Sequence, residues 1–341
     1  MYQVVQTKKW KKERSPKRIL VIRLQATGDV IITLPFVQLL KNEHPTSQID
    51  FLTRETQVSI IENLVAVTNV ISFTNSHKRW KQLLALIIIL PRLLVNRYDV
   101  VLDLQVNRYS RIIRQLLFPT AFSEFEKYTP LPAVERNWKA VERSGLVKNF
   151  AHPILSFINN NTGGIILKEN GWNQPKDLII LNPAGAFKSR NWPLAYYVSF
   201  ARIWIRKYPD SQFLILGINR IELKASSLKK ELGDKMINLV SKTSLPEAFE
   251  IIEKSTLVIS EDSGLMHIAW ALKIPTIALI GSTDKNRSSQ PGKHLVTLNS
   301  DDLPCGNCMK SDCIFGEIPS CLSRYSPEMI LDLSEKLLKR Q

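Results

Sequence analysis

The chain has little glycine, proline or cysteine for its length. Its 341 residues include 13 glycines, 18 prolines and four cysteines, while hydrophobic residues make up 44%. This composition excludes low-complexity repeats and is typical of an ordinary globular protein. The length exceeds that of one typical hydrophobic core, so we expect two domains.

Long apolar runs are also lacking. The longest, Leu83–Leu90, is too short to span a bilayer and is followed by Pro91. No separate secretory hydrophobic region follows the charged N-terminus, because the next apolar run continues directly into domain sequence. We therefore expect a cytoplasmic protein, with peripheral contact with the cytoplasmic face of the inner membrane as an alternative. The helix expected at 79–95 is interpreted as a buried scaffold element, with a helix that lies on the membrane as the alternative.

Acidic residues are scarce relative to basic ones. The chain holds 46 Lys and Arg against 31 Asp and Glu, a formal net charge of +15. Such an excess favours an anionic partner: nucleic acid, an acidic membrane surface or a phosphorylated substrate. No basic motif with interleaved aromatic residues is found, so we expect no nucleic-acid partner. Many of the charges fall in residues 1–17, which we expect to form a solvated, disordered basic arm.

What the chain does contain is a regular alternation of apolar strands and amphipathic helices. One series covers residues 18–160, with an irregular stretch at 119–135, and a second covers 177–325. Residues 161–176 predict a linker between them, and residues 326–341 predict a helix that packs back across the domains. Two such series predict an α/β fold with two Rossmann-like domains, each a doubly wound parallel sheet.

Three loops at expected strand ends carry candidate functional residues. The first is R-L-Q-A-T-G-D-V at 23–30, after the first strand. Ligands of open parallel sheets bind outside the carboxyl ends of the strands, where this loop would lie. Gly28 would allow close backbone approach, and Asp29 is interpreted either as a helix N-cap or as a general base. The loop lacks G-x-G-x-x-G, so a dinucleotide fingerprint is not supported.

The second and third loops combine glycine, cations and a helix start. The second, N-P-A-G-A-F-K-S-R-N-W-P at 182–193, contains Gly185, Lys188 and Arg190; the third, E-D-S-G-L-M-H at 261–267, opens into a helix. Free N–H groups and the dipole at a helix N-terminus favour a bound phosphate, so the two loops are expected to converge on one diphosphate. The alternatives are a solvated basic loop, an Asp/Ser helix cap and a buried histidine.

All four cysteines, Cys305, Cys308, Cys313 and Cys321, fall in one short segment with the spacing C-x2-C-x4-C-x7-C. In a cytosolic chain this density favours thiols held close together over disulfides. A zinc site, a structural knuckle and a redox-labile pair all stay open as interpretations. Because the segment follows the last clear strand, we expect a clasp far from the chemistry rather than a catalytic element.

In these motifs the chain resembles glycosyltransferase family 9, the ADP-heptose:lipopolysaccharide heptosyltransferases. The resemblance implies a GT-B architecture, with an acceptor-side first domain and a nucleotide-sugar-binding second domain facing a central cleft. It also implies an inverting transfer that needs no metal and no cofactor. The matching pieces follow in the family's order from residue 18: R-I-L-V-I-R-L-Q-A-T-G-D-V-I-I-T-L-P, Y-D-V-V-L-D-L-Q, the G-A-…-R-N-W-P loop, D-S-G-L-M-H-I-A-W-A-L and the closing four-cysteine segment.

The resemblance also implies roles for individual residues. Asp29 matches the proposed catalytic base, with Thr27 and Gly28 beside it on the acceptor side. At Arg190 the family commonly has lysine, so the charge is kept but the donor geometry differs. The donor-side residues implied by the resemblance are Gly185, Arg190, Glu222, Thr243, Asp262, Ser263, Gly264 and His267, of which Glu222 and Thr243 match more loosely.

The resulting expectation is a glycosyltransferase that moves heptose from ADP-heptose onto an anionic glycolipid acceptor of the lipopolysaccharide core. Asp29 would take the proton of the acceptor hydroxyl, while Arg190 and the helix N-terminus at 262–264 stabilise the leaving diphosphate. Arg108, Arg111 and Arg114 are candidates for contact with the acceptor. Two alternatives stay open: a nucleotide-sugar epimerase on the same scaffold, and a catalytically inactive nucleotide-sugar-binding protein.

Overall fold

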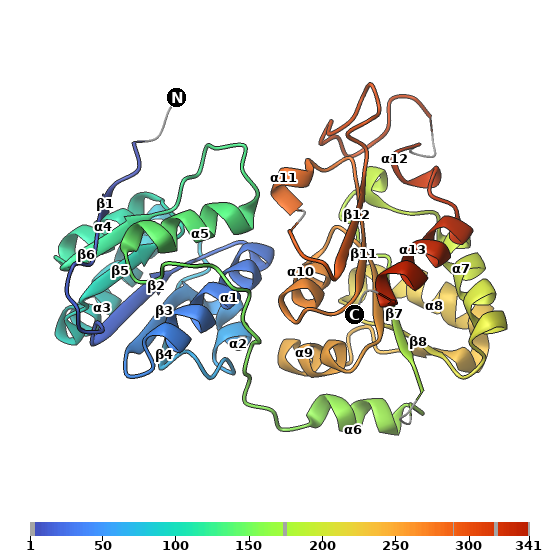
Figure 1. Cartoon of the computed structure of the whole chain (residues 1–341), viewed down its shortest axis with the longest axis horizontal. Coiled ribbons are helices and arrows are strands. Elements are labelled where there is room, and N and C mark those ends of the chain that lie inside the picture. The colour runs from blue at the N-terminus through green and yellow to red at the C-terminus, as the bar shows by residue number, and fades with distance from the viewer. Residues whose placement is uncertain (1–3, 173–175, 289, 317–319, 340–341) are drawn as a thin grey trace. The chain divides into compact units, whose positions relative to one another are not determined.

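The computed structural model describes residues 4–172, 176–288, 290–316 and 320–339, and the chain divides into two units, Met1–Ile158 and Asn159–Gln341 (Figure 1). The expected linker begins with a helix, α6 (Thr162–Glu169), which packs against α9 (Leu245–Glu253) and belongs to the second unit. Parts of three expected segments lie outside the described residues: 1–3 of the arm, 173–175 of the linker and 340–341 of the last helix.

The first unit is built on a six-stranded sheet with the order β1-β6-β5-β2-β3-β4. Its strands are parallel except for β1, which runs antiparallel to β6. Because β3 and β4 extend the sheet on one side of β2 and β5 and β6 on the other, the strand order switches between β2 and β5. The strands are β1 Thr7–Lys8, β2 Arg18–Ile22, β3 Gln48–Arg54, β4 Asn69–Phe73, β5 Val100–Asp103 and β6 Ala121–Glu124.

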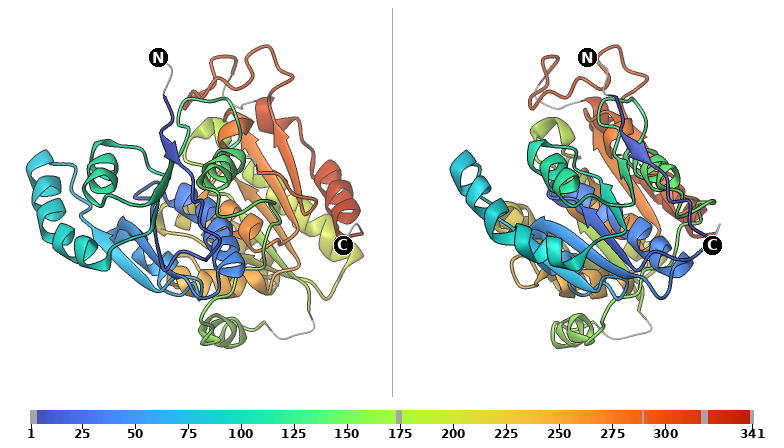
Figure 2. Two further views of the ribbon diagram at one scale, coloured as in Figure 1. Left: turned by 60° about the vertical axis from the view of Figure 1, so that its left-hand side comes forward. Right: turned by 90° about the vertical axis from the view of Figure 1, so that its left-hand side faces the viewer.

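Helices cover both faces of this sheet (Figures 1 and 2). Alternate residues of a strand point to opposite faces, and Leu20 and Ile22 of β2 pack in one core with Leu86 and Leu93 of α3. Helix α1 packs against α5, and α3 against α4. The helices are α1 Thr27–Glu43, α2 Val58–Ile61, α3 Arg79–Asn96, α4 Arg108–Leu116 and α5 Ala133–Ser144.

The second unit holds a six-stranded, wholly parallel sheet with the order β12-β11-β10-β7-β8-β9. Here the strand order switches between β7 and β10. The expected α/β fold with two parallel-sheet domains is therefore confirmed, apart from the antiparallel edge strand β1. The strands are β7 Leu178–Asn182, β8 Gln212–Ile215, β9 Met236–Asn238, β10 Leu257–Glu261, β11 Thr276–Gly281 and β12 Leu295–Asn299.

The last helix, α13 (Pro327–Leu338), is part of the core of the second unit. It packs against α7, and its residues Ile330 and Leu337 are fully buried. Just before it, the carbonyl of Tyr325 accepts a hydrogen bond from Trp192 Nε1 at 2.8 Å. That α13 also packs back across the domains stays a prediction. The other helices of this unit are α7 Leu194–Lys207, α8 Glu222–Leu232, α10 Gly264–Ala271, α11 Lys285–Ser288 and α12 Ser320–Ser323.

The N-terminal arm differs from the expectation. Its basic side chains are exposed, as expected, but the described part of the arm is not disordered, because residues 7–8 pair with β6 and Trp10 is buried. The indole Nε1 of Trp10 donates to the Arg14 carbonyl at 3.1 Å, and its backbone N–H donates to the Ser144 carbonyl at 2.8 Å. The burial of Trp10 and the pairing of β1 with β6 therefore hold the arm to the first unit in spite of its positive charge.

The stretch 119–135 also differs from the expectation. It is not irregular throughout, since it contains β6.

Helix α3 is not a buried scaffold element. Only Leu86 and Leu93 are buried on it, while large apolar side chains on its other side are exposed. Figure 2 shows α3, in cyan, on the outside of the first unit's sheet. Across the described residues, no helix combines the length and the apolar content that crossing a bilayer requires.

Replacing Trp10 tests whether the arm is anchored. We expect Trp10→Ala to lower the free energy of unfolding by about 3 kcal/mol, because a buried aromatic side chain and its indole hydrogen bond are lost. Urea unfolding of the full chain measures the change, with the exposed Val4→Ala as the matched control. Equal stability of the two variants would mean that the arm contributes nothing to the fold.

Candidate functional site

The loops that follow β7 and β10 lie side by side at the switch point of the second sheet. β10 pairs directly with β7, and Ser260 lies opposite Asn182 at the end of the ladder. Loops that follow neighbouring parallel strands leave the same edge of the sheet, where ligands of this fold class bind. The structure therefore brings together the two motifs, 182–193 and 261–267, that the sequence analysis paired.

Helix α10 begins at Gly264, with Ser263 in the N-cap position. Ser263 does not cap the helix with its side chain, which corrects that interpretation; its Oγ accepts a hydrogen bond from Asn182 Nδ2 at 2.6 Å. The same amide donates to Ser260 Oγ at 2.7 Å and ties the two strand ends together. The first-turn N–H groups of α10 therefore lie without a side-chain cap at the positive end of the helix dipole.

Asp262 is paired with Arg190. Its Oδ2 accepts hydrogen bonds from Arg190 Nη1 at 3.1 Å and from Thr283 Oγ1 at 2.8 Å. Thr283 follows β11, so a third strand end contributes to the site. The guanidinium also lies 4.7 Å from the centre of the Phe187 ring, and within the described residues its buried Nε has no hydrogen-bond partner. These contacts fix the orientation of Arg190 close to the start of α10 and leave part of its donor capacity unused.

Glu261, the last residue of β10, holds the loop after β7 in place. Its side chain is completely buried; Oε2 accepts from the Gly185 N–H and Oε1 from the Trp192 N–H, both at 2.7 Å. Burial raises the pKa of Glu261 to about 7, against the opposing effects of Lys224 and the two N–H donors. One carboxyl group thus fastens both ends of the loop that carries Arg190. The sequence analysis missed this role.

Gly185 is required by this close packing. A Cβ at this position would collide with the carbonyl oxygen of Arg190 and lie 2.9 Å from Glu261 Oε2. A larger residue would push the loop away from the carboxylate that fastens it. Gly185 therefore has a structural role, which is to let the loop pack closely against Glu261, whether or not it also binds a ligand.

Two cations at the start of α8 hold the same loop. Arg220 donates to two carbonyl oxygens of the loop, at 2.7 and 3.0 Å, and Lys224 Nζ donates to the Pro183 carbonyl at 2.8 Å. Lys224 Nζ also lies 3.8 Å from Glu261 Oε2. Burial lowers the pKa of Lys224, and Glu261 acts in the opposite direction. Neither cation was predicted, because nothing in the local sequence distinguishes these two residues from solvated basic ones.

The remaining donor-side candidates occupy the same edge of the sheet. Glu222 begins α8, after β8, and its Oε1 accepts a hydrogen bond from Asn238 Nδ2 at 3.2 Å. Thr243 lies half-buried in the turn between β9 and α9. His267 is buried within α10, in agreement with the interpretation of this residue as a buried histidine.

In the first unit, Asp29 lies in the first turn of α1, after β2. Its Oδ1 forms an ion pair with Arg23 Nη2 at 2.8 Å, and its Oδ2 accepts from the Ala26 N–H at 3.2 Å. Asp29 thus caps the helix start from the third helical position rather than as the N-cap residue. Thr27 and Gly28 precede it, both half-buried. With 38% of its side chain exposed, Asp29 is held in place and still reachable from solvent.

Arg23, the partner of Asp29, is buried at the switch point of the first sheet. It donates to the carbonyl of Leu104, which follows β5, and its guanidinium lies 4.8 Å from the centre of the Phe125 ring. Burial lowers the pKa of Arg23, opposed by Asp29 and Asp103. Burial also raises the pKa of Asp103 to about 6. The arginine stands in the first motif, but its role as the anchor of Asp29 was not predicted.

The basic residues of α4 differ in exposure and in their partners. Arg114 is buried and forms an ion pair with Glu124 Oε1 at 2.8 Å, and Arg111 Nε lies 3.4 Å from the same oxygen. The expectation that Arg114 contacts the acceptor is wrong, because its charge is neutralised inside the unit. Arg108 is exposed at the start of the helix.

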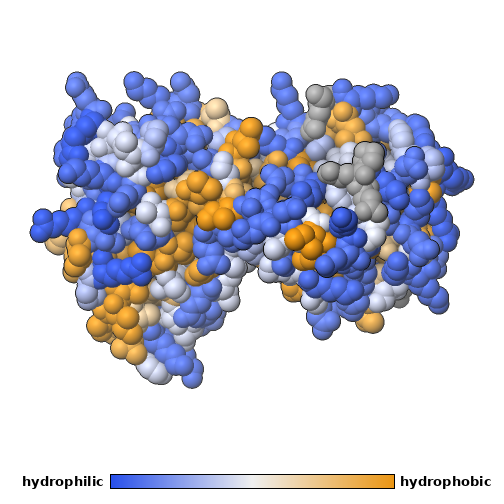
Figure 3. Space-filling view, turned by 90° about the horizontal axis from the view of Figure 1, so that it is seen from below, coloured by the Kyte–Doolittle hydropathy of each residue, from blue (hydrophilic) through white to orange (hydrophobic). Residues whose placement is uncertain are grey.

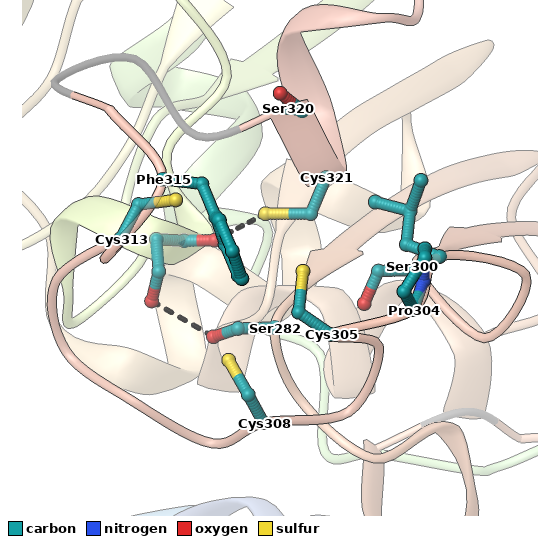
Figure 4. A pocket seen from close by; sticks show the side chains of 11 residues that line it. Ser282, Ser300, Pro304, Cys305, Cys308, Cys313, Phe315, Ser320 and Cys321 are labelled. Atoms are coloured by element: carbon teal, nitrogen blue, oxygen red, sulfur yellow. Dashed lines mark hydrogen bonds between the residues drawn. The ribbon is translucent and has the colours of Figure 1, made fainter.

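The four cysteines line one cavity of about 240 Å³ (Figure 4). Cys321 Sγ donates to the Ser189 carbonyl at 3.3 Å, and the Ser189 N–H donates to the Ser311 carbonyl at 3.1 Å. Since Ser189 precedes Arg190, the segment contacts the candidate site, and the expectation that it lies far away is wrong. The thiols are free. Within the described ranges no group of three or more His, Cys, Asp or Glu is arranged to hold a metal ion.

Comparison with known proteins places these observations in a family. A model described as glycosyltransferase family 9 (heptosyltransferase) matches residues 122–318. The chain is 26% identical over 318 residues to lipooligosaccharide heptosyltransferase 2 of Campylobacter jejuni, covering 91% of this chain and 96% of that protein. A family 9 glycosyl transferase from Veillonella parvula has a TM-score of 0.80 at 19% identity, over 95% and 98% of the two chains. The ADP-heptose lps heptosyltransferase II of Escherichia coli has a TM-score of 0.74 at 18% identity, over 95% and 99%.

Glu261→Gln tests the carboxylate that fastens the loop. A glutamine has only one acceptor oxygen, so one of the two N–H groups would face an amide NH2 and Lys224 would lose its counter-charge. We expect amide hydrogen exchange at 185 and 192 to speed up at least about tenfold, which mass spectrometry of 183–193 peptides reports. The matched control is Glu250→Gln, because Glu250 accepts the N–H groups of Asn160 and Gly163 in the same way. It should loosen residues 160–163 instead; unchanged exchange at 185 and 192 in Glu261→Gln would contradict the assigned role.

The cysteines should react at different rates. Burial and the three neighbouring thiols raise the pKa of Cys321 to about 11, whereas Cys308 is exposed. Because the thiolate is the nucleophile, iodoacetamide should label Cys308 first at pH 8, with Cys321 labelling increasing as the pH approaches 11. Peptide mass spectrometry after timed quenching measures both rates. Equal labelling of the two residues at pH 8 is the opposing result.

Proposed function

Because the chain belongs to glycosyltransferase family 9, we propose that this glycosyltransferase moves heptose from ADP-heptose to a lipopolysaccharide core acceptor. The names of its relatives support the substrates: a lipooligosaccharide heptosyltransferase at 26% identity over most of both chains, and an ADP-heptose lps heptosyltransferase of the same fold. The observation that carries the proposal is the convergence of the loops after β7, β10 and β11 around Arg190 and the start of α10.

The leaving diphosphate would bind at this convergence. The N–H groups of the first turn of α10 and the remaining donors of Arg190 supply positive potential at one point of the sheet edge. Oriented donors of this kind stabilise developing negative charge, each by roughly 3 kcal/mol in comparable sites. We propose that these groups, together with the positive end of the helix dipole, allow a transfer that needs no metal ion.

Asp262 would act as a positioning residue rather than a phosphate ligand. A free carboxylate beside a diphosphate would repel it, but Asp262 is neutralised by Arg190 and held by Thr283. Its role is to aim the guanidinium, much as a carboxylate orients a catalytic histidine. A positioning role for Asp262 would account for an acidic residue beside a site that binds an anion.

Asp29 is the proposed catalytic base. In an inverting displacement, the acceptor oxygen attacks the anomeric carbon from the side opposite to ADP, its proton passes to Asp29, and the bond from that carbon to the phosphate oxygen breaks. The carboxylate suits this task because Arg23 fixes its orientation while part of it remains exposed. Thr27 and Gly28, in the same helical turn, would contact the acceptor.

The acceptor implied by this reaction is an anionic glycolipid. We therefore propose that the enzyme works at the cytoplasmic face of the inner membrane as a peripheral protein. The excess of basic residues favours such a partner.

Asp29→Ala tests the base. With ADP-heptose and a soluble, deacylated core acceptor, we expect the turnover rate to fall about 10³-fold while the Kd for ADP changes less than about twofold. Asp29→Asn, which keeps the hydrogen bonds of the helix start, should be equally slow, and Glu62→Ala, an exposed acid of the same unit, should behave as wild type. Wild-type transfer should continue in EDTA.

Other outcomes reject parts of this proposal. Turnover that survives in both Asp29 variants, or a large loss of ADP affinity, rejects Asp29 as the base. Consumption of the nucleotide sugar without any acceptor favours the epimerase alternative. Loss of transfer in EDTA, restored by a divalent ion, rejects the metal-independent mechanism.

A further inference from the structure

Helix α3 exposes a continuous apolar stripe. Trp80, Leu84, Ile87 and Ile88 stand at the spacing that places side chains on one face of a helix. Val95 continues this face two turns after Ile88. The exposed fractions of Trp80, Ile87 and Ile88 are 62%, 59% and 67%. Soluble proteins rarely leave so many large apolar side chains together on the surface unless the patch binds something.

The stripe is visible as a surface feature of the first unit. Figure 3 shows apolar side chains gathered on the protruding lower left of the face drawn. Figure 2 shows α3 on the outer side of the sheet, where it projects from the unit. The opposite face of the helix is already in use, since Leu86 and Leu93 pack into the core with β2.

The charge around the stripe has one sign. No Asp or Glu occurs between Glu62 and Asp99, whereas Lys78, Arg79 and Lys81 cluster at the start of α3 and further basic residues follow towards its end. The basic side chains at 78, 79, 81, 92 and 97 are all exposed. An apolar helix face on an element whose own charged residues are all cations complements an anionic lipid surface. There the aliphatic side chains enter the acyl boundary and the cations meet the headgroups.

We propose that α3 docks the enzyme on an anionic membrane by lying in the plane of the interface. The inference rests on the proposed function in one respect: a glycolipid acceptor gives the enzyme a reason to bind a membrane. The surface itself is defined by the exposed stripe and its cations. Trp80 at the start of the helix would lie at headgroup level, as tryptophan does at membrane interfaces. The helix binds from one side and does not span the bilayer.

A pair of isoleucines provides the test. The full-length protein is mixed with vesicles of phosphatidylcholine containing 30% phosphatidylglycerol, and bound protein is measured by flotation. We expect Ile87→Gln with Ile88→Gln to weaken the vesicle partition coefficient at least about tenfold, since two aliphatic contacts with the lipid are lost. The matched control changes two other exposed isoleucines, Ile154→Gln with Ile165→Gln, and should bind as wild type.

The charges are tested separately. Lys78→Gln with Lys81→Gln should reduce binding to the anionic vesicles by about tenfold or more at low salt. Wild-type binding should fall in high salt and be weak on phosphatidylcholine alone. Quenching of tryptophan fluorescence by brominated lipid should decrease in Trp80→Phe.

The contrary results are distinct. Equal flotation of the Ile87/Ile88 variant and the wild type overturns the proposal, and so does a wild-type dimer in sedimentation velocity that the same variant converts to monomer. On a soluble, deacylated acceptor the variant should keep wild-type turnover and lose it only on vesicle-embedded acceptor. Failure of every protein, wild type included, on the soluble acceptor rejects the proposed function and leaves the docking surface to be judged by flotation alone.

Discussion

The contacts of the Glu261 carboxyl group are the interaction on which the candidate site of the second unit depends. The group is fully buried, and two backbone N–H groups and Lys224 offset part of the cost of burying it. By fastening the loop at Gly185 and at Trp192 it leaves the segment between them little freedom. Arg190 lies within that segment, so its position beside the start of α10 is fixed before any ligand arrives. Such preorganisation is what makes a charged group effective against a developing anion.

The fold and the location of the site could be predicted because both follow from local patterns. Alternating apolar strands and helices predict parallel sheets, and in parallel sheets the loops after strands share one edge. Asp29, Arg190 and Asp262 were singled out as candidates in this way. Their partners were not: Glu261, Lys224 and Arg23 act through contacts between segments far apart in the chain, and nothing in the local sequence distinguishes a buried acid or base from a solvated one.

The errors have physical reasons as well. The sequence of α3 is apolar around most of its circumference, so periodicity alone does not tell which face packs and which is left exposed. The N-terminal arm was judged by its charge, yet Trp10 and a two-residue strand pairing hold it to the sheet. Arg114 was assigned to a ligand by its charge, and Glu124 turned out to neutralise it. In each case tertiary packing outweighs composition.

Helix α13 also bears on how the enzyme is made. Its residues Ile330 and Leu337 complete the hydrophobic core of the second unit, and Tyr325 accepts a hydrogen bond from a tryptophan 133 positions earlier in the chain. During synthesis the residues up to Ile158 can fold while translation continues. The second unit, by contrast, cannot complete its core until the residues of α13 have left the ribosome. During synthesis the first unit can therefore be complete while the core of the second unit still lacks its last helix.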